Sequence, residues 1–140
     1  MITLEQARTI IRRAIEVGAE HDMKPLSVVV VDAGGHVKAF ERADDAPPGR
    51  FLIAHGKAYG CVMLGIAGSA QRDRAEAQPY FVNAMNGLFG GRFVPVPGGV
   101  LVRDREGRVI GAVGVTGDTS ENDAMAALAG IDAAGLAGEA

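Results

Sequence analysis

Apolar residues recur every three or four positions between residues 4 and 18, and charged residues occupy most of the places between them. This spacing is typical of a helix with one face against a core and the other in water. Thr3 and Gln6 have capping-box spacing, in which two side chains satisfy free N–H groups at a helix start. The pattern therefore predicts an amphipathic helix of about five turns that ends around His21.

A hairpin follows this helix. Residues 26–31 read Leu-Ser-Val-Val-Val-Val, a β-branched run that predicts a buried central strand. Residues 32–35 contain two adjacent glycines, which favour a tight turn. Residues 36–42 alternate in polarity and predict the returning antiparallel strand.

The middle of the chain predicts helices. Residues 49–66 form a second helix, with Leu52, Tyr59 and Met63 expected on its apolar side. The polar stretch 69–78 predicts no more than one helical turn. Pro79 is suited to the first turn of a further short helix that continues through Leu88.

Three more strands and a helix complete the prediction. Residues 92–94 predict an edge strand because prolines follow at once, and residues 100–103 and 108–115 predict a second hairpin. Ser120 and Asp123 have capping-box spacing, and a final helix with apolar positions as far as Leu136 is expected after them. Strands joined by short hairpins, with helices grouped together, predict one α+β domain over residues 1–140 with an antiparallel sheet.

Charge and composition exclude several classes of function. The net charge is −3 and no Lys/Arg run exceeds two residues, so the clustered cations of a nucleic-acid binder are absent. Cys61 is the only cysteine, which excludes an internal disulfide and a cysteine-based zinc site. No apolar run reaches the roughly 18 residues of a membrane span, and the N-terminus reads as a helix start. We expect a cytoplasmic protein that binds neither nucleic acid nor membrane.

The three histidines differ in their surroundings. His21 ends the first helix, where an imidazolium complements the helix dipole. His36 begins a strand and is expected to face solvent. His55 precedes Tyr59 by four residues and shares the apolar side of the second helix, where both a core position and a binding role are open.

Lys57 is a cation among small and apolar residues, so burial would require a partner or a shifted pKa. Asp32, at the end of the buried strand, is one possible partner. Asp32 can equally cap its own hairpin turn through the backbone. The sequence leaves these two interpretations equal.

Gly117 to Ser120 lead into the last helix, and a helix N-terminus can hold an anion. Thr116 and Ser120 would add hydroxyl groups there. The alternative, which we favour, is that the glycines of the preceding strand allow a helix to pack closely on the sheet.

Four phrases together resemble a known family: residues 29–36 (Val-Val-Val-Asp-Ala-Gly-Gly-His), residues 57–59 (Lys-Ala-Tyr), residues 96–100 (Val-Pro-Gly-Gly-Val) and residues 110–117 (Ile-Gly-Ala-Val-Gly-Val-Thr-Gly). Their order and spacing are similar to the GlcG/HbpS-type haem-binding and haem-degrading family, over essentially the whole chain. The resemblance implies a profilin-like α+β sandwich with a five-stranded antiparallel sheet flanked by helices. It also implies a homo-oligomer, either a dimer or a dimer-based octamer. Thr116 stands where a serine is common, and His55 lies where an acidic residue is frequent.

The resemblance implies an oligomeric protein that binds a small ligand: haem, a related tetrapyrrole or a small organic acid. The residues expected to bind it are Asp32, His55, Lys57, Tyr59 and Thr116, with His21 as a candidate ligand of haem iron. One alternative is a cofactor-independent lyase or isomerase acting on an aromatic or hydroxy-acid catabolic intermediate, with His55 and Lys57 as acid and base. Another is a structural assembly module.

Overall fold

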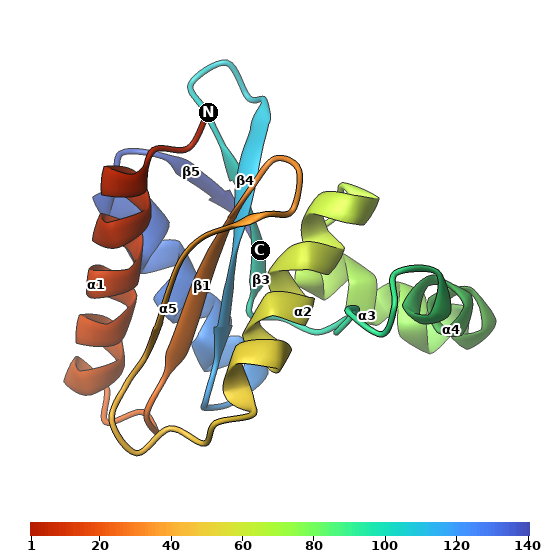
Figure 1. The fold of residues 1–140 in the computed structure, drawn as a ribbon, viewed down its shortest axis with the longest axis horizontal. Helices are drawn as coiled ribbons and strands as arrows, with labels where there is room; N and C mark the ends of the chain where they lie inside the picture. The colour runs from red at the N-terminus through yellow and green to blue at the C-terminus, as the bar shows by residue number, and fades with distance from the viewer.

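A computed structural model describes residues 1–140 and contains five helices and five strands (Figure 1). The helices are α1 (Leu4–Glu20), α2 (Arg50–Leu64), α3 (Gly68–Ala77), α4 (Pro79–Leu88) and α5 (Ser120–Ala133). The strands are β1 (Ser27–Asp32), β2 (Val37–Arg42), β3 (Gly99–Arg103), β4 (Val109–Thr116) and β5 (Ala137–Glu139).

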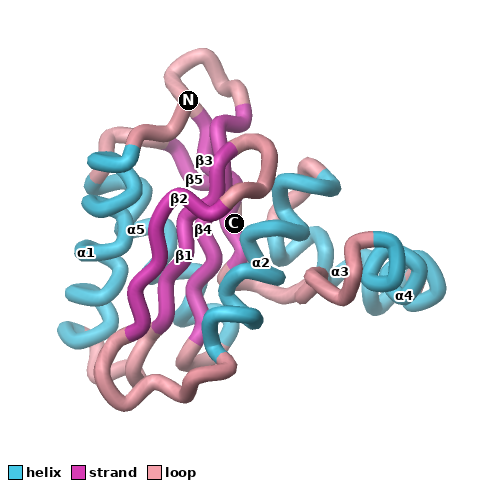
Figure 2. The backbone as a smooth tube through the Cα atoms, in the orientation of Figure 1, coloured by secondary structure: helices cyan, strands magenta, loops and turns pink.

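The strands form one sheet in the order β2-β1-β4-β3-β5, and every neighbouring pair is antiparallel (Figure 2). The central strands β1 and β4 are buried along nearly their whole length, as the apolar runs of the sequence predict. The predicted α+β class with a five-stranded antiparallel sheet is confirmed.

Helices cover both faces of the sheet: α1 and α5 lie on one side and α2 on the other (Figure 1). Side chains alternate along β1 accordingly. Val28 and Val30 join the larger apolar core with α1 and α5, whereas Val29 and Val31 join a smaller core under α2. The predicted first helix and its Thr3–Gln6 capping box are confirmed.

Helices α3 and α4 extend away from the sheet beyond α2 (Figure 1). Residues 68–77 form a ten-residue helix, so the prediction of a single helical turn there is wrong. Helix α4 begins at Pro79 as predicted, yet none of its residues is buried. No single helix is long and apolar enough to cross a membrane; α2 and α3 reach that length only when counted together, and they meet at 82°.

The predicted edge strand at residues 92–94 is wrong. These residues form a loop in which the Val94 N–H donates to the Gly56 carbonyl of α2, and the Phe93 side chain is buried against α2. Their hydrogen bonds and side chains are thus directed to a helix instead of a neighbouring strand.

The fifth strand is β5, at the C-terminal end of the chain, where the sequence predicted the continuation of the last helix. Helix α5 stops at Ala133, and Gly135 takes a positive φ of 74° that turns the chain back beside β3. The cap of α5 is Thr119, whose hydroxyl accepts from the Asn122 N–H, and not Ser120.

Candidate functional site

Five rings form a continuous row along one flank of α2, and two of them, Phe40 and Phe51, also pack against the core beneath the helix. We call Phe40, Phe51, His55, Tyr59 and Phe89 the aromatic strip. Neighbouring ring centroids in this order are 4.8, 5.8, 5.4 and 6.0 Å apart. Three of the rings come from α2 at intervals of four residues, which places them on one side of the helix. All five are partly exposed, so the strip is accessible from solvent.

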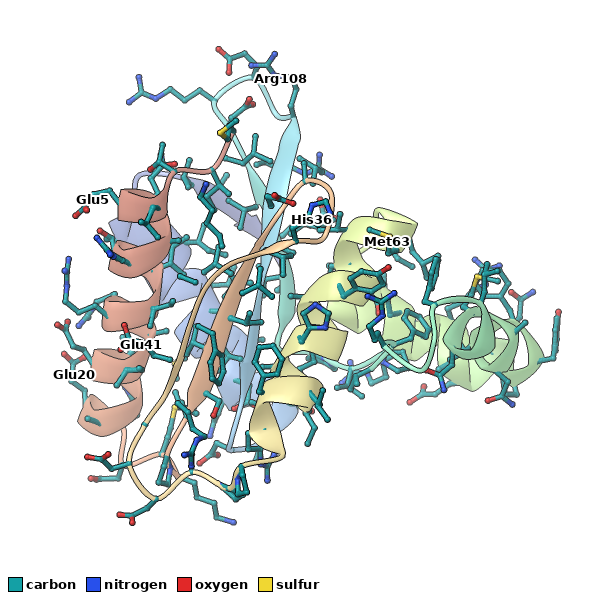
Figure 3. The ribbon with its side chains drawn as sticks, in the orientation of Figure 1. Glu5, Glu20, His36, Glu41, Met63 and Arg108 are labelled. Carbon is teal, nitrogen blue, oxygen red and sulfur yellow. The ribbon has the colours of Figure 1, made fainter.

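The β1–β2 turn borders this strip. In Figure 3, His36 lies on that turn and Met63 lies on the neighbouring part of α2. A Cβ on Gly35 would lie 2.9 Å from the Met63 methyl carbon and 3.1 Å from the Tyr59 ring, so the turn is in close contact with α2. The turn thereby closes one side of the strip.

His55 lies at the centre of the strip, and neither of its ring nitrogens has a hydrogen-bond partner. Burial lowers the pKa of the His55 imidazole, and the guanidinium of Arg92 lowers it further. Arg92 stacks 4.4 Å from the centroid of Tyr59, where its charge interacts with the ring face. The site therefore holds a neutral imidazole between aromatic rings, with one unpaired N–H group and one nitrogen lone pair that is free to bind.

Lys57 points to the opposite side of α2, toward the sheet. Its ammonium lies 3.1 Å from the Asp123 carboxylate and donates to the Val115 carbonyl at 2.9 Å. Burial lowers the pKa of Lys57 and raises the pKa of Asp123, while the attraction between the two opposes both changes. His55 and Lys57 do not converge on a common substrate, because residues two apart on a helix lie about 200° apart.

Asp32 caps its own turn. One carboxylate oxygen accepts from the Gly34 and His36 N–H groups at 2.9 and 3.0 Å, and these bonds contribute to a lowered pKa of Asp32. The His36 ring lies 3.3 Å from the same oxygen and is largely exposed. Of the two interpretations left open by the sequence, the turn cap is confirmed and the pairing of Asp32 with Lys57 is wrong.

Thr116 is buried at the end of β4 and accepts a hydrogen bond at 3.0 Å from the Arg50 guanidinium in the first turn of α2. The glycines around it serve packing: a Cβ on Gly114 would lie 2.0 Å from the Ala54 carbonyl oxygen of α2. Close packing of helix on sheet, the interpretation that we favoured, is confirmed.

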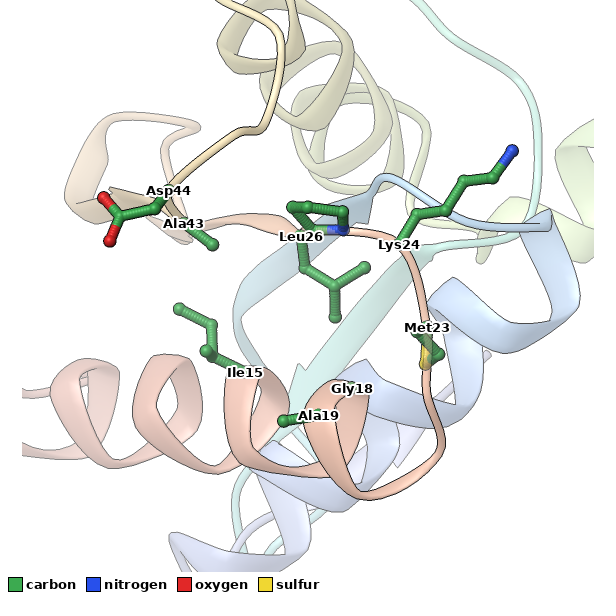
Figure 4. Close-up of a pocket in the computed structure, with 9 residues that line it drawn as sticks. Ile15, Gly18, Ala19, Met23, Lys24, Leu26, Ala43 and Asp44 are labelled. Carbon is green, nitrogen blue, oxygen red and sulfur yellow. The ribbon is translucent and has the colours of Figure 1, made fainter.

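His21 is exposed just beyond the end of α1, which contributes no residue to the strip. Its Nδ1 lies 3.0 Å from the Val17 carbonyl oxygen, which can only accept, so Nδ1 carries the proton and Nε2 is free. An apolar cavity of about 300 Å³ opens near this end of α1, between Ile15, Met23 and Leu26 (Figure 4). No group of three or more His, Cys, Asp or Glu side chains is arranged to hold a metal ion.

The sequence indicated His55 and Tyr59 but missed the other members of the strip. Phe51 precedes His55 by four residues, a signal that was available. Phe40 and Phe89 join only through the tertiary fold, and so does Arg92. The sequence also placed Leu52 on the buried side of α2, whereas it is 70% exposed and the small residues of α2 face the sheet.

The chain belongs to the family described as haem degrading protein HbpS-like, whose sequence model matches residues 2–132. The predicted resemblance is thus confirmed. The chain is 32% identical over 133 residues to an uncharacterized 15.0 kDa protein of the dhaT–dhaS intergenic region of Citrobacter freundii, and the match covers 94% of this chain and 90% of that protein.

Solved structures share the fold. The crystal structure of a complex of PduOC with haem matches with a TM-score of 0.83 and 26% identity, over 94% of both chains. The crystal structure of HbpS matches with a TM-score of 0.81 and 26% identity, over 94% of this chain and 88% of that one. Klebsiella pneumoniae protein ORFY matches with a TM-score of 0.80 and 27% identity, over 96% and 90%.

Proposed function

We propose that this protein binds haem, or a related tetrapyrrole, on the aromatic strip, with His55 as the axial ligand of the iron. The observation that carries the proposal is a half-buried neutral imidazole without a hydrogen-bond partner at the centre of a row of five rings. Membership of the HbpS-like family and the likeness to a protein solved as its haem complex support the choice of ligand.

The residues of the strip fit the chemistry of the group. Haem iron binds a neutral imidazole nitrogen, and its flat apolar macrocycle packs against aromatic faces. Tyr59 offers such a face beside His55, and the Arg92 guanidinium supplies a cation for a propionate carboxylate. Asp32, Lys57 and Thr116 act behind the strip in this proposal, by holding the hairpin turn and α2 in place.

His21 is the second candidate for the iron ligand, and a specific observation favours it. A ligating histidine usually donates its other ring N–H to a carbonyl or carboxylate, and His21 already donates to Val17. The small apolar cavity near the end of α1 would contact the edge of a bound macrocycle or hold a small organic acid beside Lys24.

Titration of the purified protein with haem, followed by absorbance, tests the proposal. We expect a saturable one-to-one change of the Soret band that His55→Ala abolishes. His36→Ala, which removes an exposed imidazole from the bordering turn, should leave that change intact. Loss in His21→Ala instead of His55→Ala would move the ligand to the end of α1. A non-saturating titration in the unmodified protein would refute haem binding.

We also propose that the protein is a homo-oligomer, as its family resemblance implies. Helix α4 supports this because it leaves apolar side chains without cover: Tyr80 is 71% exposed and Leu88 is 70% exposed. Such a face is typical of a protein–protein interface. Light scattering with size-exclusion chromatography should give a multiple of the 14.5 kDa chain mass, and Leu88→Ser with Tyr80→Ser should lower it. A monomeric unmodified protein would refute this part.

A further inference from the structure

One buried ion pair joins the two helix layers beside the end of the central strand β4. Lys57 belongs to α2 and Asp123 to α5, and these helices cover opposite faces (Figure 1). The Lys57 and Asp123 side chains are 4% and 1% exposed, and their charged atoms lie 3.1 Å apart. Further bonds join Lys57 to the Val115 carbonyl and the Asp118 N–H to Asp123 at 3.0 Å. The pair is therefore enclosed and hydrogen-bonded within the fold.

Two glycines leave the space that Lys57 occupies. A Cβ on Gly98 would lie 2.8 Å from the Lys57 Nζ atom, and Gly98 has a positive φ of 107° that disfavours other residues. A Cβ on Gly99 would lie 2.6 Å from the Lys57 carbonyl oxygen. The start of β3 is thus shaped around this one side chain and the helix backbone that carries it.

The inward side of α2 carries mostly short side chains. Apart from Lys57, its buried residues are small: Ala54, Gly56, Ala58, Gly60 and Cys61. Small residues let a helix approach a sheet closely, but they provide few projections that interlock with the sheet and resist rotation of the helix about its axis. Lys57 is the one long side chain of α2 that is buried, whereas Phe51 and Val62 pack against the core only in part and Arg50 reaches Thr116 from the first turn of the helix. The charge of Lys57 has a single carboxylate partner.

Rotation of α2 would displace the aromatic strip directly. His55 and Tyr59 lie two residues before and two after Lys57, on the opposite side of the helix. With side chains roughly 6 Å from the helix axis, a rotation of about 20° would move the His55 ring by about 2 Å. A displacement of that size would separate the imidazole from a ligand held by the other rings.

From these contacts we infer that the Lys57–Asp123 pair is a positioning device, which fixes the rotation of α2 and so directs His55 and Tyr59 at the ligand. The inference rests on the proposed ligand site at the aromatic strip. Lys57 and Asp123 touch no ligand in this account. They act through the helix, and a buried pair of this kind contributes geometric specificity more than net stability.

The test replaces the pair by apolar residues of similar shape in the variant Lys57→Met with Asp123→Leu. Replacement of both partners of a buried pair typically preserves folding stability. We expect an unchanged melting temperature together with haem affinity weakened by roughly a hundredfold or more, because a misplacement of about 1 Å already costs on that order and the expected displacement is about 2 Å. The His55 Cε1–H NMR signal of the ligand-free variant, measured at one fixed pH, should lose the ring-current shift from Phe51 and Tyr59.

A second ion pair provides the matched control. Arg72 and Glu121 join α3 to α5 at 3.0 Å on the surface, so Arg72→Met with Glu121→Leu removes a pair without touching the inward side of α2. That variant should keep both the haem affinity and the His55 signal. If the double replacement of Lys57 and Asp123 fails to fold, Asp123→Asn, which keeps the shape and removes the charge, should show the same displaced His55 signal.

An unchanged His55 signal in a folded Lys57 and Asp123 variant would overturn the positioning role. The NMR readout needs no haem, so it separates this inference from the proposed function. If the unmodified protein fails to bind haem but the variant shows the displaced signal, only the proposed haem binding is refuted. A protein that binds haem through His55 with no displacement refutes only the positioning role.

Discussion

The contact of α2 with the sheet predicts a large cost for one added methyl group. A Cβ on Gly114 of β4 would lie 2.0 Å from the carbonyl oxygen of Ala54 and 3.1 Å from the N atom of Ala58. Both are backbone atoms of a helix, so neither can swing aside. Raising the closest distance to the 3.4 Å of ordinary contact requires α2 to withdraw by about 1.4 Å. Overpacking of a buried site costs about 1–3 kcal/mol, and Gly114→Ala should fall at the upper end.

Urea and thermal unfolding measure this cost. About 3 kcal/mol corresponds to a melting temperature lowered by roughly 10 °C in a chain of this length. Gly87→Ala is the matched control, because a Cβ at this helical position meets nothing within 4 Å and alanine favours helix by up to about 1 kcal/mol. If Gly114→Ala has the same melting temperature as the unmodified protein or the Gly87→Ala control, the close contact between α2 and β4 is refuted.

Three further predictions follow from single side chains. Thr3→Ala removes a capping box and should lower the free energy of unfolding by about 1 kcal/mol, as measured in urea. Burial raises the pKa of the Cys61 thiol to about 12, so a thiol reagent at pH 8 should leave it unmodified in the folded protein and label it in denaturant; labelling of the native protein at the denatured rate would contradict this. The Lys24 N–H donates to Asp118 and lowers the pKa of that carboxyl below its usual 3.8. Stability from this bond is complete above the usual pKa and is lost as the pH falls through the lower folded pKa, so Asp118→Asn should differ from the parent less at pH 2 than at pH 7 in denaturant unfolding.

Local patterns were sufficient for most of the fold. The β-branched run of β1 and the spacing of α1 each report burial on known sides, and a tight turn needs only its own residues. Strand β5 has no such signal, because its three residues are exposed and pair only with the edge of β3. The prediction for residues 92–94 failed for the opposite reason. Their apolar side chains pack on α2, and a composition typical of strands does not indicate whether the segment pairs with a strand or packs on a helix.

The residues of the candidate site likewise fall into those that local spacing indicates and those that only the tertiary fold brings together. His55 and Tyr59 are one helical turn apart, so their neighbourhood is visible in the sequence. The partner of Lys57 could not be identified from the sequence, because Asp32 and Asp123 are both carboxylates and each lies near the end of a strand or the start of a helix. Asp123 becomes the partner because the Lys57 side chain runs beside Gly98 to reach it. Gly98 takes that position only when β3 and β4 are paired.

Rescue of a histidine variant by free imidazole tests the central claim most directly. His55→Ala keeps the helix and removes the nitrogen that we assign to the iron, and the other rings of the aromatic strip remain in place. Absorbance spectra of the ferric haem complex should lose the histidine-ligated Soret band in this variant and regain it when imidazole is added. A His55→Ala protein whose haem spectrum matches that of the unmodified protein before any imidazole is added would contradict the account.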